Sequence, residues 1–419
     1  MYDIFKEITA TMKRNKLRTA LTGFAVAWGI FIIIFLLGAG NGLINAQLLQ
    51  RNRFMANSMM VGGGYTSKAN DGLKEGRDIQ LDDNDIYITS HSFKQNVDET
   101  GAISVKSGIT FANGENYING KLSGVYPNYP KINKIEMLHG RFINQIDMNE
   151  SRRVIVLSAD DAKELSGGKT ANMLGQYVKV GDMAFRIVGI YKTDRSGMNA
   201  DIFTPFTTFR AIYNTGNKLD NIVFTFHGLP TEEANDEFET QYKARVNRNH
   251  RAAPDDESAV WIWNRFTQNM QMDTGIGIIR TSLWIIGLFT LLSGIVGVSN
   301  IMLITVKERT REFGIRKAIG AKPWSILRLI ITESVIITTF FGYIGMMAGI
   351  AANMYMDNTI GNMKMDSGMF EATMFYNPTV GLDVCISATL VMILAGTIAG
   401  LIPARKAAAI RPIEALRAE

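Results

Sequence analysis

Hydrophobic residues are concentrated in four long runs, and elsewhere apolar and polar positions alternate over short stretches. The charge-free runs are Ala20–Gly40, Thr281–Val306, Ser334–Met356 and Val384–Ala404. Because a helix rises about 1.5 Å per residue, each run can cross the roughly 30 Å hydrocarbon core of a bilayer. The pattern predicts an α-helical membrane domain. Its four transmembrane helices are expected at 20–42, 281–306, 324–356 and 384–404.

The charges of the connecting segments predict how these helices are oriented. Residues 1–19, 307–328 and 405–419 together hold sixteen basic and six acidic residues. Residues 357–383 hold one basic and four acidic residues. Cytoplasmic loops of membrane proteins are enriched in lysine and arginine. Both termini and the 307–323 segment are therefore expected in the cytoplasm, and the 357–383 loop outside.

The segment between the first two runs, residues 43–280, has a mixed α/β texture and is expected outside. Stretches rich in Val, Ile, Tyr and Phe, bounded by Gly, Asn and Asp, predict strands. They are Met59–Val61, Ala102–Lys106, Arg153–Leu157, Tyr177–Val180, Phe185–Tyr191 and Ile222–Phe226. Helices are expected at Asp82–Ser92, Ala159–Leu165, Thr207–Tyr213 and Thr231–Val246. The fold class is thus a four-helix membrane domain with a large mixed α/β extracytoplasmic domain inserted between the first and second spans.

Finer features of this outer domain are also predicted. A helix is expected to continue over Asn41–Met60, until Gly62-Gly63-Gly64 breaks the chain, and residues 265–280 to form a second helix that returns to the membrane. The stretch 121–150 contains two prolines and is expected to be mostly irregular. Two subdomains are predicted. One is formed by residues near 52–111 and 220–264 beside the membrane, and a more distal one by residues near 112–219.

Composition removes several classes of function. The net charge is +5, but residues 41–280 carry 27 basic and 28 acidic residues, so the positive excess lies in the cytoplasmic segments. This distribution removes nucleic acid as a partner and fits a lipid bilayer. A single cysteine, Cys385, excludes an intrachain disulfide. Gly168-Lys169-Thr170 lacks the preceding glycine of a phosphate loop, because Lys163 stands there. No cofactor and no catalytic or metal site is therefore expected on this chain.

Residues 1–19 predict an amphipathic helix on the cytoplasmic membrane surface. Apolar side chains occur at helical spacing and are followed by a basic cluster that leads into the first span. The apolar positions are Ile4, Phe5, Ile8 and Met12, and the basic ones are Lys13, Arg14, Lys16 and Arg18.

The 307–323 segment is the most informative cytoplasmic stretch. It predicts about thirteen helical residues, then Gly320 near the helix end, then Pro323 in the first turn of the next helix. Phe313, Ile315 and Ile319 are apolar among many charges. A short charged helix of this kind is either a solvated turn or an anchor that docks into a groove of a cytoplasmic protein. The residues alone leave both open.

Polar and small residues inside the predicted spans suggest interhelical contacts. Glu333 is expected to form a structural ion pair, with Arg328 as its partner, in preference to a role in proton transfer. Asn300, beside Ser299, is expected to form hydrogen bonds between helices. Small residues at close spacing favour helix packing within the chain over a dimer face. They are Gly294, Gly297, Gly345, Gly349, Gly396 and Gly400.

Several of these stretches together resemble one known family. Asn300–Ala321, with the sequence NIMLITVKERTREFGIRKAIGA, resembles the hallmark of MacB/FtsX-type ABC transporter permeases. The C-terminal Gly400–Arg417 and the entry segment Asn15–Thr22 resemble the same family. So do three stretches of the outer domain: Gly124–Tyr129, His139–Phe142 and Phe185–Ile190.

The resemblance implies a partner and a set of contact residues. It implies a permease dimer, of identical or paralogous chains, on a pair of ABC ATPase subunits that bind ATP and magnesium. Since residue 1 begins at the membrane-entry helix, the ATPase is expected on a separate chain. The helix that contacts it would contain Glu308, Arg309, Thr310, Arg311, Glu312, Gly314, Arg316 and Lys317, with the 13–18 stretch nearby.

The implied mechanism is mechanotransmission in the inner membrane. ATP binding in the ATPase would move the spans and, through two stalk helices, the periplasmic domain. The expected function is therefore that of a non-enzymatic permease subunit that exports peptides, drugs or other envelope substrates. Alternatives are a lipoprotein-extracting permease and an FtsX-like regulator of a cell-wall hydrolase that transports nothing. The sequence leaves the substrate, a periplasmic adaptor and an outer-membrane channel open.

Overall fold

The computed structural model describes residues 16–51, 55–168, 173–193, 201–360, 364–366, 371–373 and 375–409. The chain divides into two compact units. The helical unit comprises Met1–Ala46, Gly275–Met363 and Thr373–Glu419, and the sheet unit comprises Gln47–Thr274 and Lys364–Ala372.

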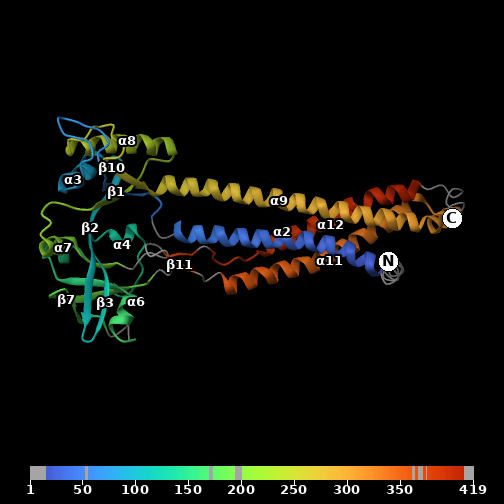
Figure 1. Ribbon diagram of the computed structural model, residues 1–419, viewed down its shortest axis with the longest axis horizontal. Helices are drawn as coiled ribbons and strands as arrows, with labels where there is room; N and C mark the ends of the chain where they lie inside the picture. The colour runs from blue at the N-terminus through green and yellow to red at the C-terminus, as the bar shows by residue number, and fades with distance from the viewer. Residues whose placement is uncertain are drawn as a thin grey trace. The chain divides into compact units, whose positions relative to one another are not determined.

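Long helices build the helical unit and lie side by side (Figure 1). They are α2 (Lys16–Arg51), α9 (Arg265–Glu308), α11 (Pro323–Thr359) and α12 (Leu382–Ala409), of which α2 and α9 extend into the sheet unit. In the described part of the chain, four helices are long and apolar enough to cross a membrane. They coincide with the four charge-free runs, which confirms the predicted four-helix membrane domain.

Glycines let three of these helices approach closely. A Cβ atom at Gly345 of α11 would lie 2.1 Å from the carbonyl oxygen of Ala27 on α2. A Cβ at Gly396 of α12 would lie 2.1 Å from Oγ1 of Thr338 on α11, and one at Gly400 would also clash with α11. These small residues therefore pack within one chain, as predicted, because a larger side chain would push the helix backbones apart.

The sheet unit is built on a ten-stranded mixed sheet with strand order β10-β1-β9-β2-β3-β8-β5-β7-β4, and β6 pairs with β2 and β7. Two pairs are parallel, β3 with β8 and β5 with β7, and the others are antiparallel. The strands are β1 (Ser58–Gly63), β2 (Val97–Asn113), β3 (Asn116–Val125), β4 (Met137–Gly140), β5 (Val154–Ser158), β6 (Tyr177–Val180), β7 (Met183–Tyr191), β8 (Ile202–Pro205), β9 (Asn221–Phe226) and β10 (Val260–Asn264). A separate pair joins β11 (Lys364–Asp366) and β12 (Glu371–Thr373).

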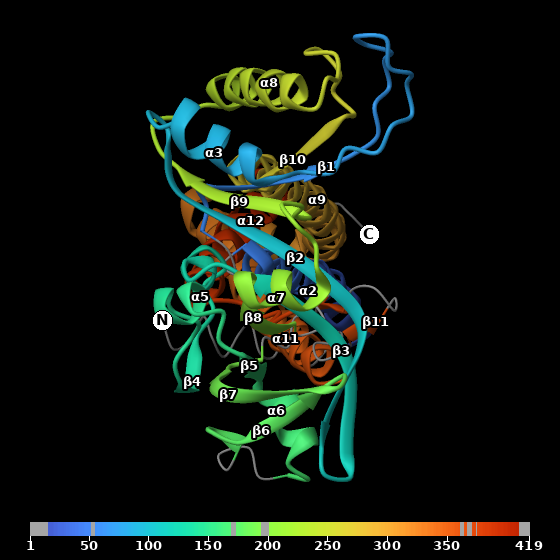
Figure 2. The ribbon, with the colours of Figure 1, turned by 90° about the vertical axis from the view of Figure 1, so that its left-hand side faces the viewer.

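The long strand β2 runs through both halves of this sheet (Figure 2). Its first half pairs with β9, and its second half pairs with β3 and β6. A register shift between Lys106 and Ile109 contains Gly108, whose φ of +72° is easy only for glycine. Hydrogen bonds of one sheet therefore join residues of the two predicted subdomains. The division itself stays a prediction.

In the described ranges, six short helices accompany the sheet, and side chains cap the start of several of them. They are α3 (Asp83–Ser92), α4 (Tyr129–Ile132), α5 (Gln145–Asn149), α6 (Ala159–Leu165), α7 (Phe206–Tyr213) and α8 (Glu232–Asn249). Asp82 caps α3 through the backbone amides of Asn84 and Asp85, and Thr231 caps α8 through that of Ala234. Helices α3 and α8 lie on the same side of β1 and β9 (Figure 2) and bury Ile88, Phe238 and Tyr242 in a shared core.

Two expectations for this region are wrong. Helix α2 ends at Arg51, and β1 begins at Ser58, so the helix predicted over Asn41–Met60 is shorter; Gly62 and Gly63 pair within β1 and do not break the chain. The 121–150 stretch is also more regular than predicted, with the end of β3, then α4, β4 and α5. Such short elements are stabilised by tertiary contacts more than by their own sequence.

Candidate coupling site

A short helix, α10 (Thr310–Ala318), joins α9 to α11 and contains most of the residues singled out from the sequence. Arg309 lies between α9 and α10, with φ −92° and ψ 13°. Gly320 follows α10 with φ +102°, and Pro323 opens α11. The glycine permits a sharp reversal, and the proline has no amide to satisfy at a helix start. Phe313 is buried and anchors α10 in the apolar core of the helical unit.

The inner side of α10 is attached to α11 by an ion pair. The Nη1 atom of Arg309 lies 3.3 Å from Oε2 of Glu333, whose side chain is 6% exposed. The Arg309 guanidinium also contacts the Phe313 ring, 5.3 Å from its centroid. The sequence predicted Arg328 as the partner of Glu333, and this was wrong. Arg328 is exposed, and Arg309 is brought to Glu333 by the reversal between α10 and α11.

Glu312 extends this pair into a charged network on α10. It accepts hydrogen bonds from Arg309, at 2.9 Å, and from Arg316, at 2.8 Å. Burial alone would raise the pKa of the Glu312 carboxyl, but the hydrogen bond and charge of Arg309, with those of Arg316, outweigh it and lower the pKa below its usual value. Glu312 is therefore ionised at neutral pH and holds the two arginines in place.

A second contact attaches α10 to α12. The Lys317 ammonium donates to the backbone carbonyl of Ala408, in the last turn of α12. Carbonyls of a final helical turn have no partner within their helix, and the helix dipole favours a cation there. Lys317 thus caps the C-terminal end of α12 and holds the C-terminal end of α10 against it.

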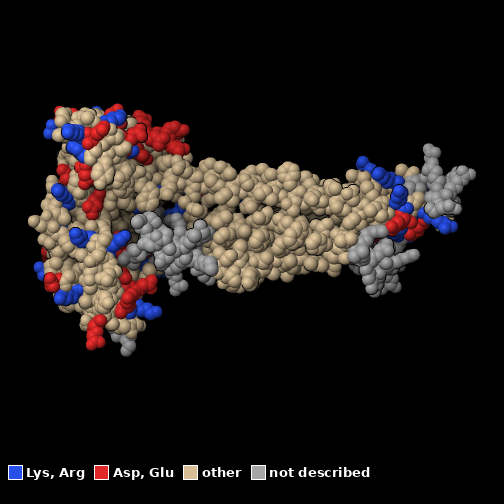
Figure 3. Space-filling view, viewed as in Figure 1, with Lys and Arg blue, Asp and Glu red and all other residues tan. Residues whose placement is uncertain are grey.

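The outer side of α10 is exposed. Glu308, Arg311 and Ile315 are exposed at helical spacing, and Ile319 follows with 82% of its surface exposed. Beyond the reversal, Trp324 is 71% exposed. A surface depression of about 770 Å³ lies between these elements, and Lys322 and Arg328 are among its lining residues. On the face shown in Figure 3, the charged side chains of the helical unit gather at the end that holds these residues.

The structure thus divides the residues predicted to contact an ATPase into two groups. Arg309, Glu312, Arg316 and Lys317 make contacts within the chain, and Phe313 and Gly314 are buried. Thr310 donates its hydroxyl hydrogen to the carbonyls of Val306 and Lys307. Glu308 and Arg311 face outward. The sequence missed the exposure of Ile319 and Trp324, although apolar residues between basic ones were a signal.

Other predicted residues lie elsewhere. Lys13 and Arg14 fall outside the described residues, and of Lys16 and Arg18 only the helical backbone is described. Asn300 is exposed on α9, and no interhelical hydrogen bond is found for it within the described ranges. The interhelical hydrogen bond expected of Asn300 stays a prediction, and so does the place of the 13–18 stretch near the ATPase.

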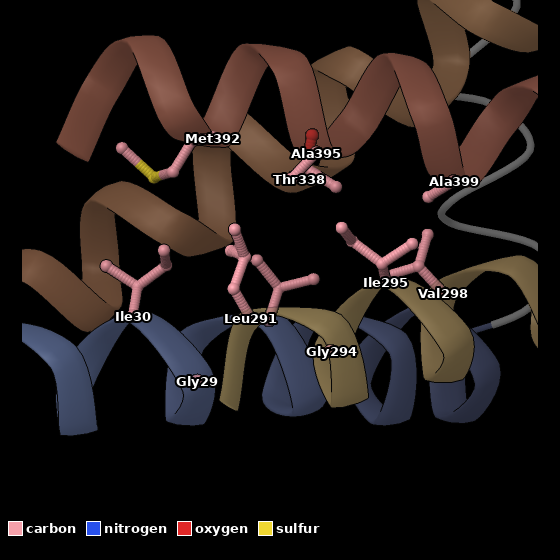
Figure 4. Close-up of a pocket in the computed structure, with 11 residues that line it drawn as sticks. Gly29, Ile30, Leu291, Gly294, Ile295, Val298, Thr338, Met392, Ala395 and Ala399 are labelled. Atoms are coloured by element: carbon pink, nitrogen blue, oxygen red, sulfur yellow. The ribbon is translucent and has the colours of Figure 1, made fainter. Parts of the chain in front are cut away.

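The centre of the helical unit is closely packed. A cavity of about 20 Å³ lies between α2, α9, α11 and α12 (Figure 4). Its lining is apolar except for Thr338, whose hydroxyl donates to the carbonyl of Ser334 at 2.9 Å. This volume holds about one water molecule. The cavity is too small to be a solute path within one copy of the chain.

Comparison with known proteins gives the family. A family model described as the MacB-like periplasmic core domain matches residues 19–241, and one described as the FtsX-like permease C-terminal region matches residues 284–412. The chain belongs to the MacB/FtsX-like ABC transporter permeases. The first match covers most of the sheet unit, and the second contains α10.

This permease is similar to two known transport proteins and to one solved structure. The uncharacterized ABC transporter permease YknZ of Bacillus subtilis is 30% identical over 71% of this chain and 70% of its own length. The macrolide export ATP-binding/permease protein MacB of Bdellovibrio bacteriovorus is 24% identical over 98% of this chain, which spans 60% of that relative. The crystal structure of the periplasmic region of MacB from Actinobacillus actinomycetemcomitans aligns with a TM-score of 0.42 and 17% identity, over 53% of this permease and 95% of that chain.

Proposed function

We propose that this permease transmits ATP-driven motion from an ATP-binding cassette to its α/β domain. ATP and Mg²⁺ are bound by the cassette, which lies outside residues 1–419, and this chain performs no chemistry. The motion drives export or extrusion of envelope substrates such as peptides or drugs. The helical unit lies in the inner membrane with both termini in the cytoplasm, and two permease copies share a pair of cassettes. A periplasmic adaptor and an outer-membrane channel are further candidate partners.

The division of α10 into two sides is the observation that carries this proposal. A solvated turn would need only charge, and its side chains would have no reason to differ. Here one side is fixed to α11 by Arg309, which Glu312 also contacts, and to α12 by Lys317. The other side, with Arg311, Ile315 and Ile319, offers the spaced anchors by which a helix binds in a groove. The arrangement favours the docking alternative left open by the sequence.

The close packing of the helical unit favours a role in transmitting motion over a role as a channel for the substrate. A cavity of about 20 Å³ takes no peptide or drug, and the four long helices carry only one buried acid, Glu333, among the described core residues. A proton or ion pathway requires a chain of ionisable groups through the membrane. Glu333 is instead paired with Arg309.

Co-purification tests the proposal. The tagged permease is isolated from its native membrane in mild detergent, and ATP hydrolysis of the preparation is measured. We expect an ABC ATPase to co-purify, and Glu308→Ala with Arg311→Ala to reduce its recovery at least tenfold. The matched control is Arg405→Ala, which removes an exposed cation from α12 and should leave recovery unchanged. The proposal fails if no ATPase is recovered with the wild type in any detergent, or if both variants recover it equally.

A further inference from the structure

Glu333 is a buried carboxylate inside an apolar helix, and it has a defined partner. Glu333 is 4% exposed, and its Oε2 atom accepts a hydrogen bond from Arg309 at 3.3 Å. Removing one member of such a pair leaves a buried charge without compensation, so the pair resists separation. The side chain of Arg309 is 16% exposed and is held from its other side by Glu312. One end of α10 is therefore fixed to α11 by directional contacts.

The other end of α10 is fixed to the neighbouring helix. Lys317 donates to Ala408 at the end of α12. Helices α11 and α12 are in turn joined closely, because Ser334 donates its hydroxyl to the carbonyl of Gly396 at 2.8 Å. A Cβ atom at Gly342 would lie 2.0 Å from the sulfur of Met392. Each of the three helices α10, α11 and α12 thus contacts the other two.

Helix α9 is held differently. Its glycines make ordinary van der Waals contacts with α2, since a Cβ at Gly294 or Gly297 would lie 3.7 or 3.6 Å from the nearest atom of Ala25. The hydroxyls of Thr290 and Thr305 donate to carbonyls of α9 itself. Near its N-terminal end α9 pairs with α2 through Asp273 and Arg51, at 2.5 Å, whereas Val298, Met302 and Val306 toward its C-terminal end lie in the apolar core. Apolar contacts permit small sliding motions between packed helices. The helix ends at Glu308, and Arg309 stands between it and α10.

We propose that Glu333 is a positioning residue whose pair with Arg309 makes α10, α11 and α12 one rigid body. This body moves relative to α9 by a change of backbone conformation at Arg309. A cassette that displaces α10 then displaces α11 and α12 with it, and not the coupling helix alone. The inference rests on the proposed function only for the source of the motion. The rigid body itself is a property of this chain.

Spin-label distances test the rigid body in the full chain. In a Cys385→Ala background reconstituted in lipid nanodiscs, labels are placed at exposed positions. The pair Ala318 and Leu390 joins α10 to α12, and the pair Ala318 and Val296 joins α10 to α9. We expect a narrow distance distribution for the first pair. Glu333→Gln should at least double its width, because the charged anchor of α10 is lost.

Two further variants separate positioning from folding. Arg405→Gln, which removes an exposed charge from α12, should leave the width unchanged. Glu333→Asp, which keeps the carboxylate, should retain most of the narrow distribution if Glu333→Gln broadens it or fails to fold. An unchanged width in a folded Glu333→Gln variant would overturn the proposal, and so would a Glu333→Asp variant as broad as Glu333→Gln.

A trapped complex separates this inference from the proposed function. ATP and vanadate are added to the permease with its co-purified ATPase, and both distances are measured again. We expect the Ala318–Val296 distance to shift and the Ala318–Leu390 distance to stay constant. A shift of both distances contradicts the rigid body. If neither distance responds to ATP while Glu333→Gln still broadens the first pair, the rigid body stands and the proposed source of motion is wrong.

Discussion

The side-chain amide of Asn353 on α11 donates a hydrogen bond of 3.0 Å to the backbone carbonyl of Ile34 on α2. Both residues are buried, and the contact joins helices that are more than 300 positions apart in the sequence. The Asn353 side chain fits there because Gly38 of α2 leaves room for it, since a Cβ atom at Gly38 would lie 2.1 Å from the Asn353 amide nitrogen. A polar residue and a glycine together fix the register of α2 against α11.

This hydrogen bond predicts a measurable contribution to stability. Asn353→Ala should lower the free energy of unfolding by about 0.6–1.7 kcal/mol, the range for hydrogen bonds between membrane helices. Asn300→Ala on the exposed surface of α9 is the matched control and should change it little. Thermal unfolding in detergent micelles measures both. Equal effects of the two substitutions would show that Asn353 contributes no specific contact.

Because α11 lies close to α2 at Gly345, a larger side chain there should strongly destabilise the protein. Gly345→Val should lower the free energy of unfolding by about 1–3 kcal/mol or more, because its Cβ would meet the Ala27 carbonyl and the backbones would have to separate. Gly277→Ala on α9 has open space around it and serves as the control. Folded yield after purification and the midpoint of thermal unfolding report the difference. A tolerated Gly345→Val would mean that the helices pack differently.

The exposed apolar residues after α10 predict a loss of partner binding without loss of stability. Ile319→Ser should reduce recovery of the cassette ATPase about tenfold, since a central apolar anchor of an interface contributes about 1–2 kcal/mol or more. The thermal midpoint of the permease should stay constant because Ile319 is 82% exposed. Ala321→Ser is a neighbouring control. Normal ATPase recovery with Ile319→Ser would remove this residue from the interface.

The buried carboxyl of Asp161 should make the stability of the sheet unit depend on pH. Burial raises the pKa of its carboxyl to about 6, despite the hydrogen bond from the Ser158 hydroxyl at 2.7 Å. The folded state therefore binds a proton that the unfolded state releases near pH 4. The stability from this group is complete below about pH 4 and is lost as the pH rises through about 6, by at most about 3 kcal/mol.

Replacement of the carboxyl tests this pH dependence. In Asp161→Asn the fall in stability between about pH 4 and pH 6 should flatten, whereas in Asp182→Asn, an exposed acid of the same unit, it should remain. Amide hydrogen exchange of β5 and α6 at several pH values, corrected for intrinsic rates, measures the local free energy of opening. The assignment is wrong if both variants keep the wild-type slope.

Much of the architecture follows from local sequence. The bilayer requires about twenty apolar residues for each spanning helix, so hydropathy alone located the four spans. Helix α8 was predictable because Thr231 and its following acids satisfy a helix start locally. Strands rich in β-branched residues, such as β5 and β7, were also located. Strands β3 and β8 were missed, since β3 is rich in glycine and polar residues and both are held by their neighbours in the sheet.

The residues around α10 also divide into those that local sequence predicts and those that depend on the tertiary fold. Local sequence was enough to predict that α10 is a charged helix followed by a glycine and a proline, because helix ends depend on residues within a few positions. It did not determine that Arg309 and not Arg328 pairs with Glu333, or that Lys317 closes α12. Those partners depend on the direction in which the chain reverses and on which helices then lie adjacent. The tertiary fold sets these partners, because an ion pair needs two groups that are close in space, whatever their separation in the sequence.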